Sequence, residues 1–476
     1  MKVSQLLKVQ CGKLLDCEIT GLTSDSRKVK PGMMFFCVNG PTVDGHEFAE
    51  QAVLKGAAVV VAERDLGLEN QILVEDTHKA FFSAAAAWFN NPLENMKLIG
   101  VTGTNGKTSV TVMLKAILES YGHKCGLIGT IQHMIGDKTV PSNNTTPGAY
   151  ELNELFSKMR DSGCDTVIME VSSHALDQQR ICGVRFQVAM FTNLTQDHLD
   201  YHKTMQNYLL AKRKLFEMAE IAVVNYDDPA YKQLTEGLPL KLVTYSAESN
   251  NATYSAKGIS YRADGVDFDF VGYGIIGRMR LKTGGRFSVY NGLCAASCAV
   301  TLGVPVEIVS KALHELNGVK GRAEAVPTGR DFHVIIDYAH TPDGLQNILE
   351  TFRDVPHNRL IALFGCGGDR DKSKRPKMGA TVARLADFAI VTSDNPRTEN
   401  PSAIIKDILV GMKDAKIPYV VIENRIDAIK YAIAHAQKGD IIVLAGKGHE
   451  TYQILSTGKI HLDEREIVKE ALEETK

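Results

Sequence analysis

Residues 96–121 read MKLIGVTGTNGKTSVTVMLKAILESY, and this stretch decides the fold. MKLIGV is a short apolar run typical of a buried strand, whereas SVTVMLKAILESY places apolar residues at helical intervals. The glycine-containing turn between them therefore connects a strand to a helix. Glycines in such a turn let backbone N–H groups converge on an anion at the positive end of the helix, and Lys107 adds a mobile positive charge. The stretch predicts a phosphate-binding loop.

The loop departs at one position from the full Walker pattern, which requires glycine where this chain has Val101. A simple glycine turn with a solvent-exposed lysine is the alternative interpretation. The order of strand, loop and helix favours the phosphate loop, in which Thr108 or Ser109 would supply a hydroxyl to Mg²⁺. The loop residues that we expect to bind the nucleotide are Gly103, Thr104, Asn105, Gly106, Lys107, Thr108 and Ser109.

The length and composition set limits on the class of protein. A chain of 476 residues has room for about three domains of roughly 150 residues each. With a net charge of −2, the chain does not have the basic character that is typical of nucleic-acid-binding proteins. The chain starts without a signal-peptide segment, and no apolar run approaches the roughly 20 residues that span a bilayer, so we expect a cytoplasmic protein without membrane insertion. The nine cysteines lack the spacing of a zinc site or a redox pair.

We expect an α/β protein of three domains. Residues 1–94 hold short strand-like runs and an alanine-rich helix, which predict a small N-terminal α/β domain. Residues 95–322 alternate strands and helices, which predicts a central phosphate-loop domain with a mainly parallel sheet and an antiparallel insertion near 250–290. Residues 323–476 alternate again, with strands apolar on both faces, as in a Rossmann-like doubly wound domain.

Polar clusters follow four strand-like runs of the last domain. Ligands of doubly wound sheets bind beyond the carboxyl ends of the strands, so these clusters are expected to face one crevice. They are DYAHTPD (337–343), GCGGDRDK (365–372), TSDNPR (392–397) and AGKGHE (445–450).

Two further side chains follow strands of the central domain. Glu170 ends the run DTVIME, and His198 follows VAMFTNL. Both are therefore expected beside the phosphate loop, where a carboxylate and a neutral imidazole could bind Mg²⁺, although imidazole is an unusual ligand for this ion. A surface or helix-capping carboxylate for Glu170 and a satisfied interior histidine for His198 are the alternatives. In YLLAKRKLFEMAE, the pattern alone favours a solvated helix face for the basic residues 212–214.

Taken together, motifs along the chain resemble those of the Mur ligases, and most closely the members that add the third residue of the peptidoglycan stem peptide. The resemblance is colinear from about residue 20 to residue 455, and the motifs are specific as a set. They are GTNGKTS (103–109), NTTP (144–147), EVSSHAL (170–176), TNLTQDHLDYH (192–202), AK (211–212), FSVYN (287–291), GRAE (321–324), DYAHTPD (337–343), GCGGDRDKSKRP (365–376), DNPR (394–397) and GKGHE (446–450).

The resemblance implies an ATP-dependent ligase with Mg²⁺ as cofactor. ATP would phosphorylate the γ-carboxyl of D-Glu in UDP-MurNAc-L-Ala-D-Glu, and an amine of meso-diaminopimelate would then displace phosphate. The developing charge needs fixed positive groups, supplied by Lys107 and by Mg²⁺ near Thr108, Glu170 and His198. Lys212 matches the family lysine that is carbamylated, and its carbamate would be an anionic metal ligand. The implied partners are small molecules alone, and we expect a monomer.

The remaining site residues are also implied by the resemblance. The N-terminal domain would hold the UDP end of the nucleotide sugar, the central domain ATP and the last domain the amino acid. Asn291, Arg322 and Asp337 match ATP contacts that domain closure would bring in. Matches for the UDP-sugar substrate are Ser24, Ser26, Pro41, Thr42, Val43, Asn144, Thr145, Thr146, Ser172, Gln178 and Arg180. Ser24 and Pro41 depart from the family, which commonly has an apolar residue and a histidine there, and TSDSR alone also reads as a polar turn.

The motif DNPR bears on the choice of amino acid. Arg397 offers a planar fork for a carboxylate, and meso-diaminopimelate has a distal carboxylate that lysine lacks. Within the family this motif marks the diaminopimelate enzymes, and Glu450 could pair with the distal ammonium. A helix cap with Arg397 in solvent is the alternative interpretation. The implied amino-acid contacts are Arg370, Asp394, Asn395, Pro396, Arg397, Gly446 and Glu450.

Three other functions are compatible with parts of the chain. A lysine-adding Mur ligase would share almost every motif. A folylpolyglutamate synthetase-like ligase would share the central and last domains, but it lacks the first domain and DNPR. A nucleotide-binding switch without turnover would keep the phosphate loop, yet it would not require the polar clusters at the strand ends.

Overall fold

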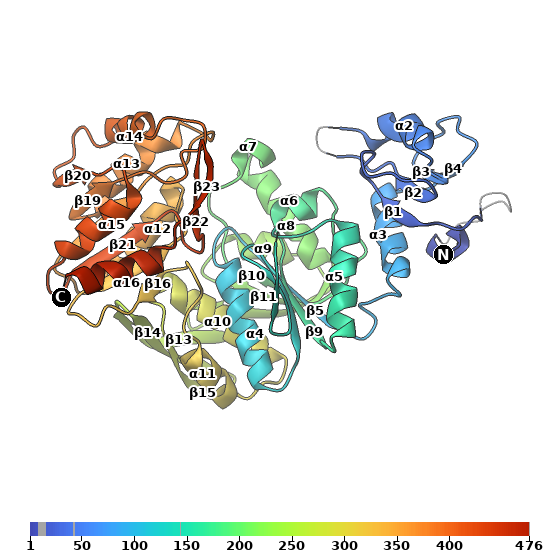
Figure 1. Ribbon diagram of the computed structural model, residues 1–476. Helices are drawn as coiled ribbons and strands as arrows, with labels where there is room; N and C mark the ends of the chain where they lie inside the picture. Colours follow the sequence, from blue (N-terminus) through green and yellow to red (C-terminus); the bar gives the residue numbers. More distant parts are fainter. Residues whose placement is uncertain (8–15, 41–42, 143, 476) are drawn as a thin grey trace. The chain divides into compact units, whose positions relative to one another are not determined.

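The computed structural model describes residues 1–7, 16–40, 43–142 and 144–475, and it forms two compact units. The first unit comprises residues 1–245 and 297–304, and the second comprises residues 246–296 and 305–476. Both units are mixed α/β structures with parallel sheets, as the sequence predicts (Figure 1). The exact domain bounds expected from the sequence, 1–94, 95–322 and 323–476, remain predictions. In the described part of the chain, no helix combines the length and the apolar character needed to cross a membrane.

The first unit begins with a small parallel sheet in the order β1-β2-β3-β4. Its strands are β1 (Gly21–Thr23), β2 (Met33–Phe36), β3 (Val59–Ala62) and β4 (Gln71–Leu73), and its helices are α1 (Val3–Leu6), the 3₁₀ turn η1 (Gly45–Phe48), α2 (Ala49–Leu54) and α3 (Thr77–Trp88). The alanine-rich helix expected from the sequence is α3, and Asp76 caps it by accepting a hydrogen bond from the Lys79 amide.

A second sheet of this unit carries the predicted phosphate loop. Its strands follow the order β12-β11-β10-β5-β9-β6-β7-β8, parallel except at β7 and β8. The strands are β5 (Lys97–Thr102), β6 (Cys125–Ile128), β7 (His133–Ile135), β8 (Lys138–Val140), β9 (Thr166–Glu170), β10 (Phe186–Phe191), β11 (Ala219–Asn225) and β12 (Lys241–Ser246). The helices are α4 (Lys107–Ser120), α5 (Ala149–Asp161), α6 (Ser173–Asp177), α7 (Leu199–His202), α8 (Met205–Glu217) and α9 (Ala230–Thr235). Because β5, β9 and β10 are parallel neighbours, the residues that follow them share one edge.

The second unit contains the antiparallel insertion that the sequence predicts. Its strands pair in the order β13-β14-β15. They are β13 (Tyr254–Arg262), β14 (Gly265–Gly272) and β15 (Ile275–Leu281), and the chain continues through α10 (Arg286–Thr301) and α11 (Val306–Glu315).

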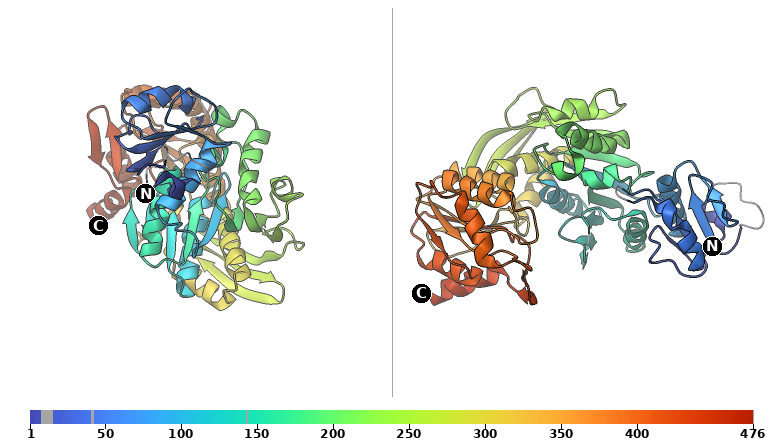
Figure 2. Two further views of the ribbon diagram at one scale, coloured as in Figure 1. Left: turned by 90° about the vertical axis from the view of Figure 1, so that its right-hand side faces the viewer. Right: turned by 90° about the horizontal axis from the view of Figure 1, so that it is seen from above.

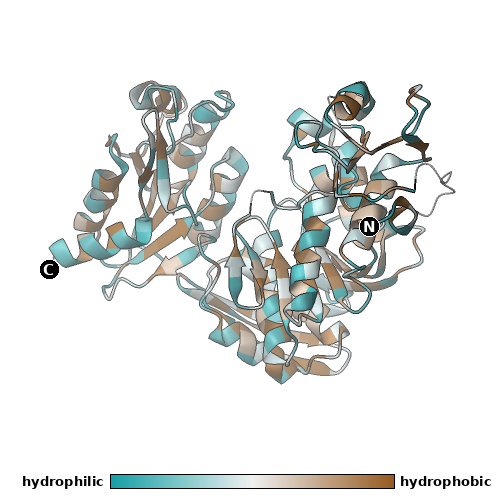
Figure 3. Ribbon diagram, turned by 45° about the vertical axis from the view of Figure 1, so that its right-hand side comes forward, coloured by the Kyte–Doolittle hydropathy of each residue, from teal (hydrophilic) through white to brown (hydrophobic). Residues whose placement is uncertain are grey.

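The rest of the second unit is a doubly wound sheet in the order β16-β17-β21-β18-β19-β20. Alternate strand residues enter two different cores: Ala362 and Phe364 pack with α12–α14, whereas Ile361 and Leu363 pack with α15 and α16. The strands are therefore apolar on both sides, which Figure 3 shows as brown ribbons. The strands are β16 (Glu324–Val326), β17 (His333–Asp337), β18 (Leu360–Phe364), β19 (Phe388–Val391), β20 (Tyr419–Val421) and β21 (Ile441–Ala445); the helices are α12 (Pro342–Arg353), α13 (Lys374–Leu385), α14 (Pro401–Val410), α15 (Arg425–Ala434) and α16 (Glu464–Glu474).

One element of this unit has no counterpart in the sequence-based expectation. Strands β22 (Tyr452–Leu455) and β23 (Gly458–His461) form a separate hairpin, drawn in red in Figures 1 and 2. Each strand is only four residues long, and exposed residues predominate in β23. Such short runs give little periodic signal in the sequence.

Candidate active site

The phosphate loop has the backbone conformation that its glycines were expected to provide. Gly103 and Gly106 have φ angles of +146° and +89°, and a β-carbon at Gly103 would lie 1.9 Å from Thr192 Oγ1. Lys107 is the first residue of α4, and its Nζ donates hydrogen bonds to the carbonyls of Gly103 and Thr104, both at 2.9 Å. The lysine charge is thus held over the loop at the helix N-terminus.

Two of the residues predicted to bind metal meet beside this loop. The hydroxyl of Thr108 donates a 2.9 Å hydrogen bond to Oε1 of Glu170, the last residue of β9. Glu170 is 1% exposed, and the backbone and side chain of Thr130 donate to its two oxygens at 2.9 and 2.8 Å. The surface-carboxylate alternative is therefore wrong for Glu170.

These oxygen donors suit Mg²⁺, which usually takes one or two carboxylates and keeps several waters. Such a site does not need a cluster of protein ligands, and no group of three or more His, Cys, Asp or Glu side chains that could hold a metal occurs in the described ranges. Thr108 and Glu170 are the residues that would hold the ion.

His198 occupies the turn before α7 with a φ angle of 53°, a strained value for a residue other than glycine. Its side chain is about half exposed, and Nε2 lies 3.4 Å from Asp197 Oδ2. Partial burial lowers its pKa, Asp197 opposes this, and the charges of Lys107 and Lys212 lower it further. The lowered pKa favours the neutral imidazole, and the exposure of the side chain does not fit the alternative role as an interior structural histidine.

Lys212 is 1% exposed, so the solvated-face interpretation is wrong for this residue. Its Nζ lies 4.3 Å from the ring centre of Tyr208, one helical turn earlier. Burial, followed by the charge of Lys107, lowers the pKa of Lys212 well below its usual value. The solvated-face interpretation does fit Lys214, which pairs with Asp177 at the surface.

The structure groups several of the predicted nucleotide-sugar residues. Thr146 donates to the Glu170 carbonyl at 2.9 Å and accepts from the Ser172 amide at 3.0 Å. Arg180 donates to the Thr146 carbonyl at 3.1 Å and to Gln178 Oε1 at 2.9 Å. These residues form one hydrogen-bonded cluster after β9.

The other predicted nucleotide-sugar residues are more exposed. Asn144 and Ser24 are exposed, Ser26 is partly buried, and Val43 is 48% exposed. The Ser26 carbonyl accepts a 2.8 Å hydrogen bond from Lys55 Nζ. Pro41 and Thr42 lie outside the described residues.

In the second unit, two of the predicted ATP residues, Arg322 and Asp337, lie at or beside the segment 321–324. Asp337 accepts hydrogen bonds from the amides of Ala323 at 2.7 Å and Ala339 at 2.8 Å. Ala323 has a φ angle of 43°, and the guanidinium of Arg322 lies 5.2 Å from the ring centre of Tyr338. Burial raises the pKa of Asp337, while Arg322 opposes this. Asn291 is buried in α10.

Arg397 also has a strained backbone, with φ of 55°. Its Nη1 donates to the carbonyls of Gly368 at 2.8 Å and Asn395 at 3.4 Å. Within the described residues, its Nε and Nη2 donate to no protein group, so one edge of the guanidinium is available for a carboxylate. The solvent-exposed cap is a poor description, because the side chain is partly buried and fixed at Nη1.

The amide of Asn395 connects this loop to GKGHE. Asn395 Nδ2 donates to Glu450 Oε2 at 2.9 Å, and Lys447 Nζ donates to Asn395 Oδ1 at 2.7 Å and to the same Glu450 oxygen at 3.0 Å. Oε1 of Glu450 accepts no hydrogen bond from the described residues. One carboxylate oxygen is thus fixed and the other is available for a ligand.

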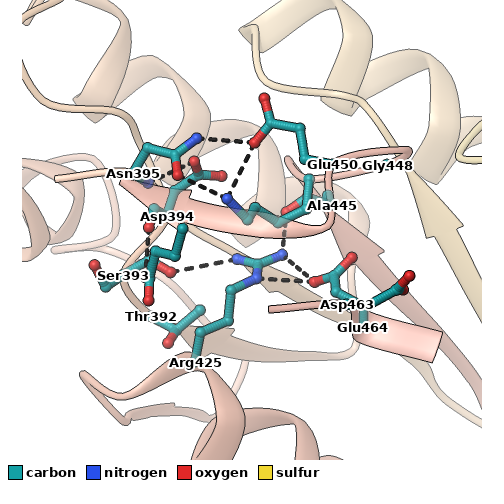
Figure 4. A network of polar contacts seen from close by, with 12 residues as sticks. Thr392, Ser393, Asp394, Asn395, Arg425, Ala445, Gly448, Glu450, Asp463 and Glu464 are labelled. Carbon is teal, nitrogen blue, oxygen red and sulfur yellow. Dashed lines mark hydrogen bonds and ion pairs between the residues drawn. The ribbon is translucent and has the colours of Figure 1, made fainter. Parts of the chain in front are cut away.

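A buried ion pair supports both loops (Figure 4). Arg425 and Glu464 are fully buried and lie 2.8 Å apart. Arg425 also donates to the Ala445 carbonyl at 2.8 Å and the Ser393 carbonyl at 3.5 Å, the residues that precede Gly446 and Asp394. A β-carbon at Gly446 would lie 2.4 Å from Asp394 Oδ2, so the two loops are closely packed. Pro396 is buried in this packing, whereas Arg370 is exposed.

Comparison with known proteins agrees with these observations. Sequence profiles described as "Mur ligase family, catalytic domain", "Mur ligase middle domain" and "Mur ligase, glutamate ligase domain" match residues 18–102, 101–299 and 321–448. The chain belongs to the Mur ligase family. It is 50% identical over 462 residues to the UDP-N-acetylmuramoyl-L-alanyl-D-glutamate--2,6-diaminopimelate ligase of Caldanaerobacter subterraneus subsp. tengcongensis, covering 96% of this chain and 95% of that protein.

Other Mur ligases are also similar to this chain over nearly its whole length. The relative of the same name in Clostridium botulinum is 44% identical over 465 residues, which cover 96% of each chain. A solved structure of a UDP-N-acetylmuramoyl-L-alanyl-D-glutamate--2,6-diaminopimelate ligase is 30% identical with a TM-score of 0.76, covering 100% of this chain and 99% of that one. The MurF ligase of Thermotoga maritima, solved with ADP, shares the fold at 19% identity and a TM-score of 0.59, over 98% of this chain and 99% of that one. The three-domain α/β architecture predicted from the sequence is that of the Mur ligases.

Sequence reasoning missed several residues of this candidate site. Lys447 and Arg425 are buried and Thr130 is partly buried, and all three bind groups in segments that are distant in sequence. Strand β22 was also not predicted from the sequence. In the structure, the amide of Ile454 in this strand donates to Asn395 Oδ1 at 2.9 Å, and its carbonyl accepts from the Arg397 amide at 3.0 Å. For Lys447, its position between the two glycines of GKGHE was the feature of the sequence that could have indicated a role.

Proposed function

We propose that this chain is an ATP-dependent, ADP-forming ligase that adds meso-2,6-diaminopimelate to UDP-N-acetylmuramoyl-L-alanyl-D-glutamate in peptidoglycan precursor synthesis. The D-Glu γ-carboxylate attacks the γ-phosphorus of ATP and releases ADP. An amine of the incoming amino acid then attacks the acyl carbon, the C–O bond to phosphate breaks, and the amine loses a proton. The requirement for ATP places this reaction in the cytoplasm.

The first unit supplies groups suited to phosphoryl transfer. Lys107 holds a positive charge at the phosphate loop, while Thr108 and Glu170 offer hard oxygen donors 2.9 Å apart. Mg²⁺ bound there would neutralise charge on the phosphate oxygens. A carbamate on Lys212 would add a further anionic ligand, and the lowered pKa of this buried amine favours the neutral form that reacts with CO₂.

The observation that carries the choice of amino acid is that Arg397 and Glu450 both bind Asn395, Arg397 at its backbone carbonyl and Glu450 at its side-chain amide. The guanidinium has one edge available, and the carboxylate has one free oxygen, so together they suit a side chain that ends in both a carboxylate and an ammonium. Lysine would leave Arg397 unpaired. That should cost on the order of 2 to 4 kcal/mol, or roughly 30- to 1000-fold in kcat/KM.

The deciding experiment measures ADP release with the UDP-dipeptide and separate additions of meso-diaminopimelate, L-lysine and L-ornithine. We expect turnover with meso-diaminopimelate and at most a few per cent of its kcat/KM with the others. Equal turnover with lysine would overturn the proposed specificity for meso-diaminopimelate, and no turnover with any amine would favour the nucleotide switch.

Two substitutions assign the roles within this reaction. Arg397→Ala should raise KM for the amino acid and erase the preference over lysine, with KM for ATP changed less than threefold. Lys107→Ala should abolish ADP release. Arg384→Ala removes an exposed arginine of α13 and serves as the matched control. Retention of the diaminopimelate preference in Arg397→Ala would show that another group reads the distal carboxylate.

A further inference from the structure

Thr130 lies in the turn that follows β6, outside every motif that the sequence marked as functional. Its amide donates to Oε1 of Glu170 at 2.9 Å, and its hydroxyl donates to Oε2 at 2.8 Å. A single residue therefore engages both oxygens of the carboxylate. Thr108 provides the remaining donor, at 2.9 Å from Oε1.

The turn also fits the carboxylate sterically. A β-carbon at Gly129, the residue before Thr130, would lie 2.6 Å from Oε1 of Glu170. Real β-carbon contacts are not this short, so the turn is packed against the carboxylate and limits its rotation. The orientation of Glu170 is consequently set by β6 and its turn as well as by its own strand.

Thr130 also contacts a residue of the NTTP segment. Its Oγ1 lies 3.0 Å from Oγ1 of Thr145. A hydroxyl has one proton, and Thr130 gives that proton to Glu170, so Thr145 is the donor of this bond. The next residue, Thr146, donates to the backbone carbonyl of Glu170 at 2.9 Å. The NTTP segment is therefore linked to Glu170 in two ways. Thr146 binds the Glu170 backbone carbonyl directly, and Thr145 is linked to the Glu170 side chain through Thr130.

We propose that Thr130 is a positioning residue that fixes the Glu170 carboxylate for a divalent cation and couples it to the nucleotide-sugar segment through Thr145. This inference rests on the proposed function, because it takes Glu170 as a metal-holding group and Thr145 as a substrate contact. Partners that orient a metal ligand typically change metal affinity by 10- to 100-fold when they are removed. Hydrogen bonds in a chain also polarise one another, so ordering Thr145 strengthens the bond to Glu170.

The test uses the full-length protein with Mn²⁺ as the probe, in the presence of AMP-PNP, and follows free Mn²⁺ by electron paramagnetic resonance. Thr130→Val keeps the shape and the amide but loses the hydroxyl, and it should weaken Mn²⁺ binding by about tenfold. Thr130→Ser restores the hydroxyl and should bind within twofold of the wild type. Thr139→Val, at an exposed threonine of β8, is the matched control and should also remain within twofold.

Each outcome is decisive. Binding by Thr130→Val within twofold of the wild type would overturn the positioning role, as would equal weakening in Thr130→Ser. If the wild type itself bound no Mn²⁺ with AMP-PNP, the proposed function would fail and the inference with it. Should the valine variant not fold, Thr130→Ala provides the same loss of the hydroxyl.

A separate experiment tests the coupling between the Glu170 carboxylate and the nucleotide-sugar segment. Addition of UDP-MurNAc-L-Ala-D-Glu should tighten Mn²⁺ binding in the wild type, and the increase should disappear in Thr130→Val and in Thr145→Val, because linkage between the sites is reciprocal. The same tightening in Thr130→Val, or none in the wild type, would overturn the coupling.

Discussion

The Nζ atom of Lys447 lies 3.0 Å from Oε2 of Glu450, and the lysine side chain is fully buried. Removing one partner of such a pair leaves the other uncompensated, so Lys447→Met should leave Glu450 Oε2 with the Asn395 amide as its remaining donor and let the carboxylate rotate. We expect KM for the amino acid to rise at least tenfold, with KM for ATP changed less than threefold. Lys459→Met, at an exposed lysine of β23, is the control. Equal increases in both KM values would indicate general damage to the fold instead.

The ion pair of Arg425 and Glu464 should show strong coupling in unfolding experiments. Arg425→Met leaves a fully buried carboxylate without its partner and should lower the free energy of unfolding by about 3 to 5 kcal/mol. Replacing both residues, as Arg425→Met with Glu464→Leu, should cost less than the sum of the single changes. Urea unfolding of the full chain measures both quantities. Additive effects would show that the two side chains act independently.

Gly368 should tolerate no side chain, because a β-carbon there would lie 1.9 Å from the Pro396 carbonyl oxygen. Gly368→Ala must displace DNPR, so we expect a loss of about 1 to 3 kcal/mol in stability and more than tenfold in kcat/KM for the amino acid. Gly274→Asn is the control, since it has a φ angle of +75°, which asparagine tolerates, and nothing within 4 Å. Normal kinetics in Gly368→Ala would mean that the loop moves without consequence.

His449 should make the protein sensitive to acid. Burial, followed by the charge of Arg322, lowers its pKa to about 4 from an ordinary value near 6.5. The unfolded chain therefore binds more protons than the folded chain between these values, so stability decreases as pH falls from about 6.5 towards 4. Between pH 7 and pH 5 this should amount to about 1 kcal/mol after allowance for solvent screening, and His449→Gln should lack it. Urea unfolding at both pH values tests this, and identical slopes in the two proteins would contradict it.

Several features of the fold and site could be predicted because their signals are local in sequence. The strand, glycine turn and helix around Lys107 all lie within residues 96–121. The strands of the last domain are apolar at successive residues, whereas β13, β14 and β15 alternate apolar and polar residues. The motifs then placed Glu170, His198 and Arg397 at strand ends. Periodicity and turn chemistry are carried by neighbouring residues, so the sequence is enough to read them.

The sequence by itself determined the α/β architecture, the phosphate loop and the residues that follow the strands. Only the tertiary structure decided that Lys212 is buried although its neighbour Lys214 is not, that Thr130 holds Glu170, and that Lys447 occupies one oxygen of Glu450. The physical reason is that burial and hydrogen bonding depend on which segments meet in space. Thr130 and Glu170 are 40 residues apart, and no periodic pattern links positions at that separation.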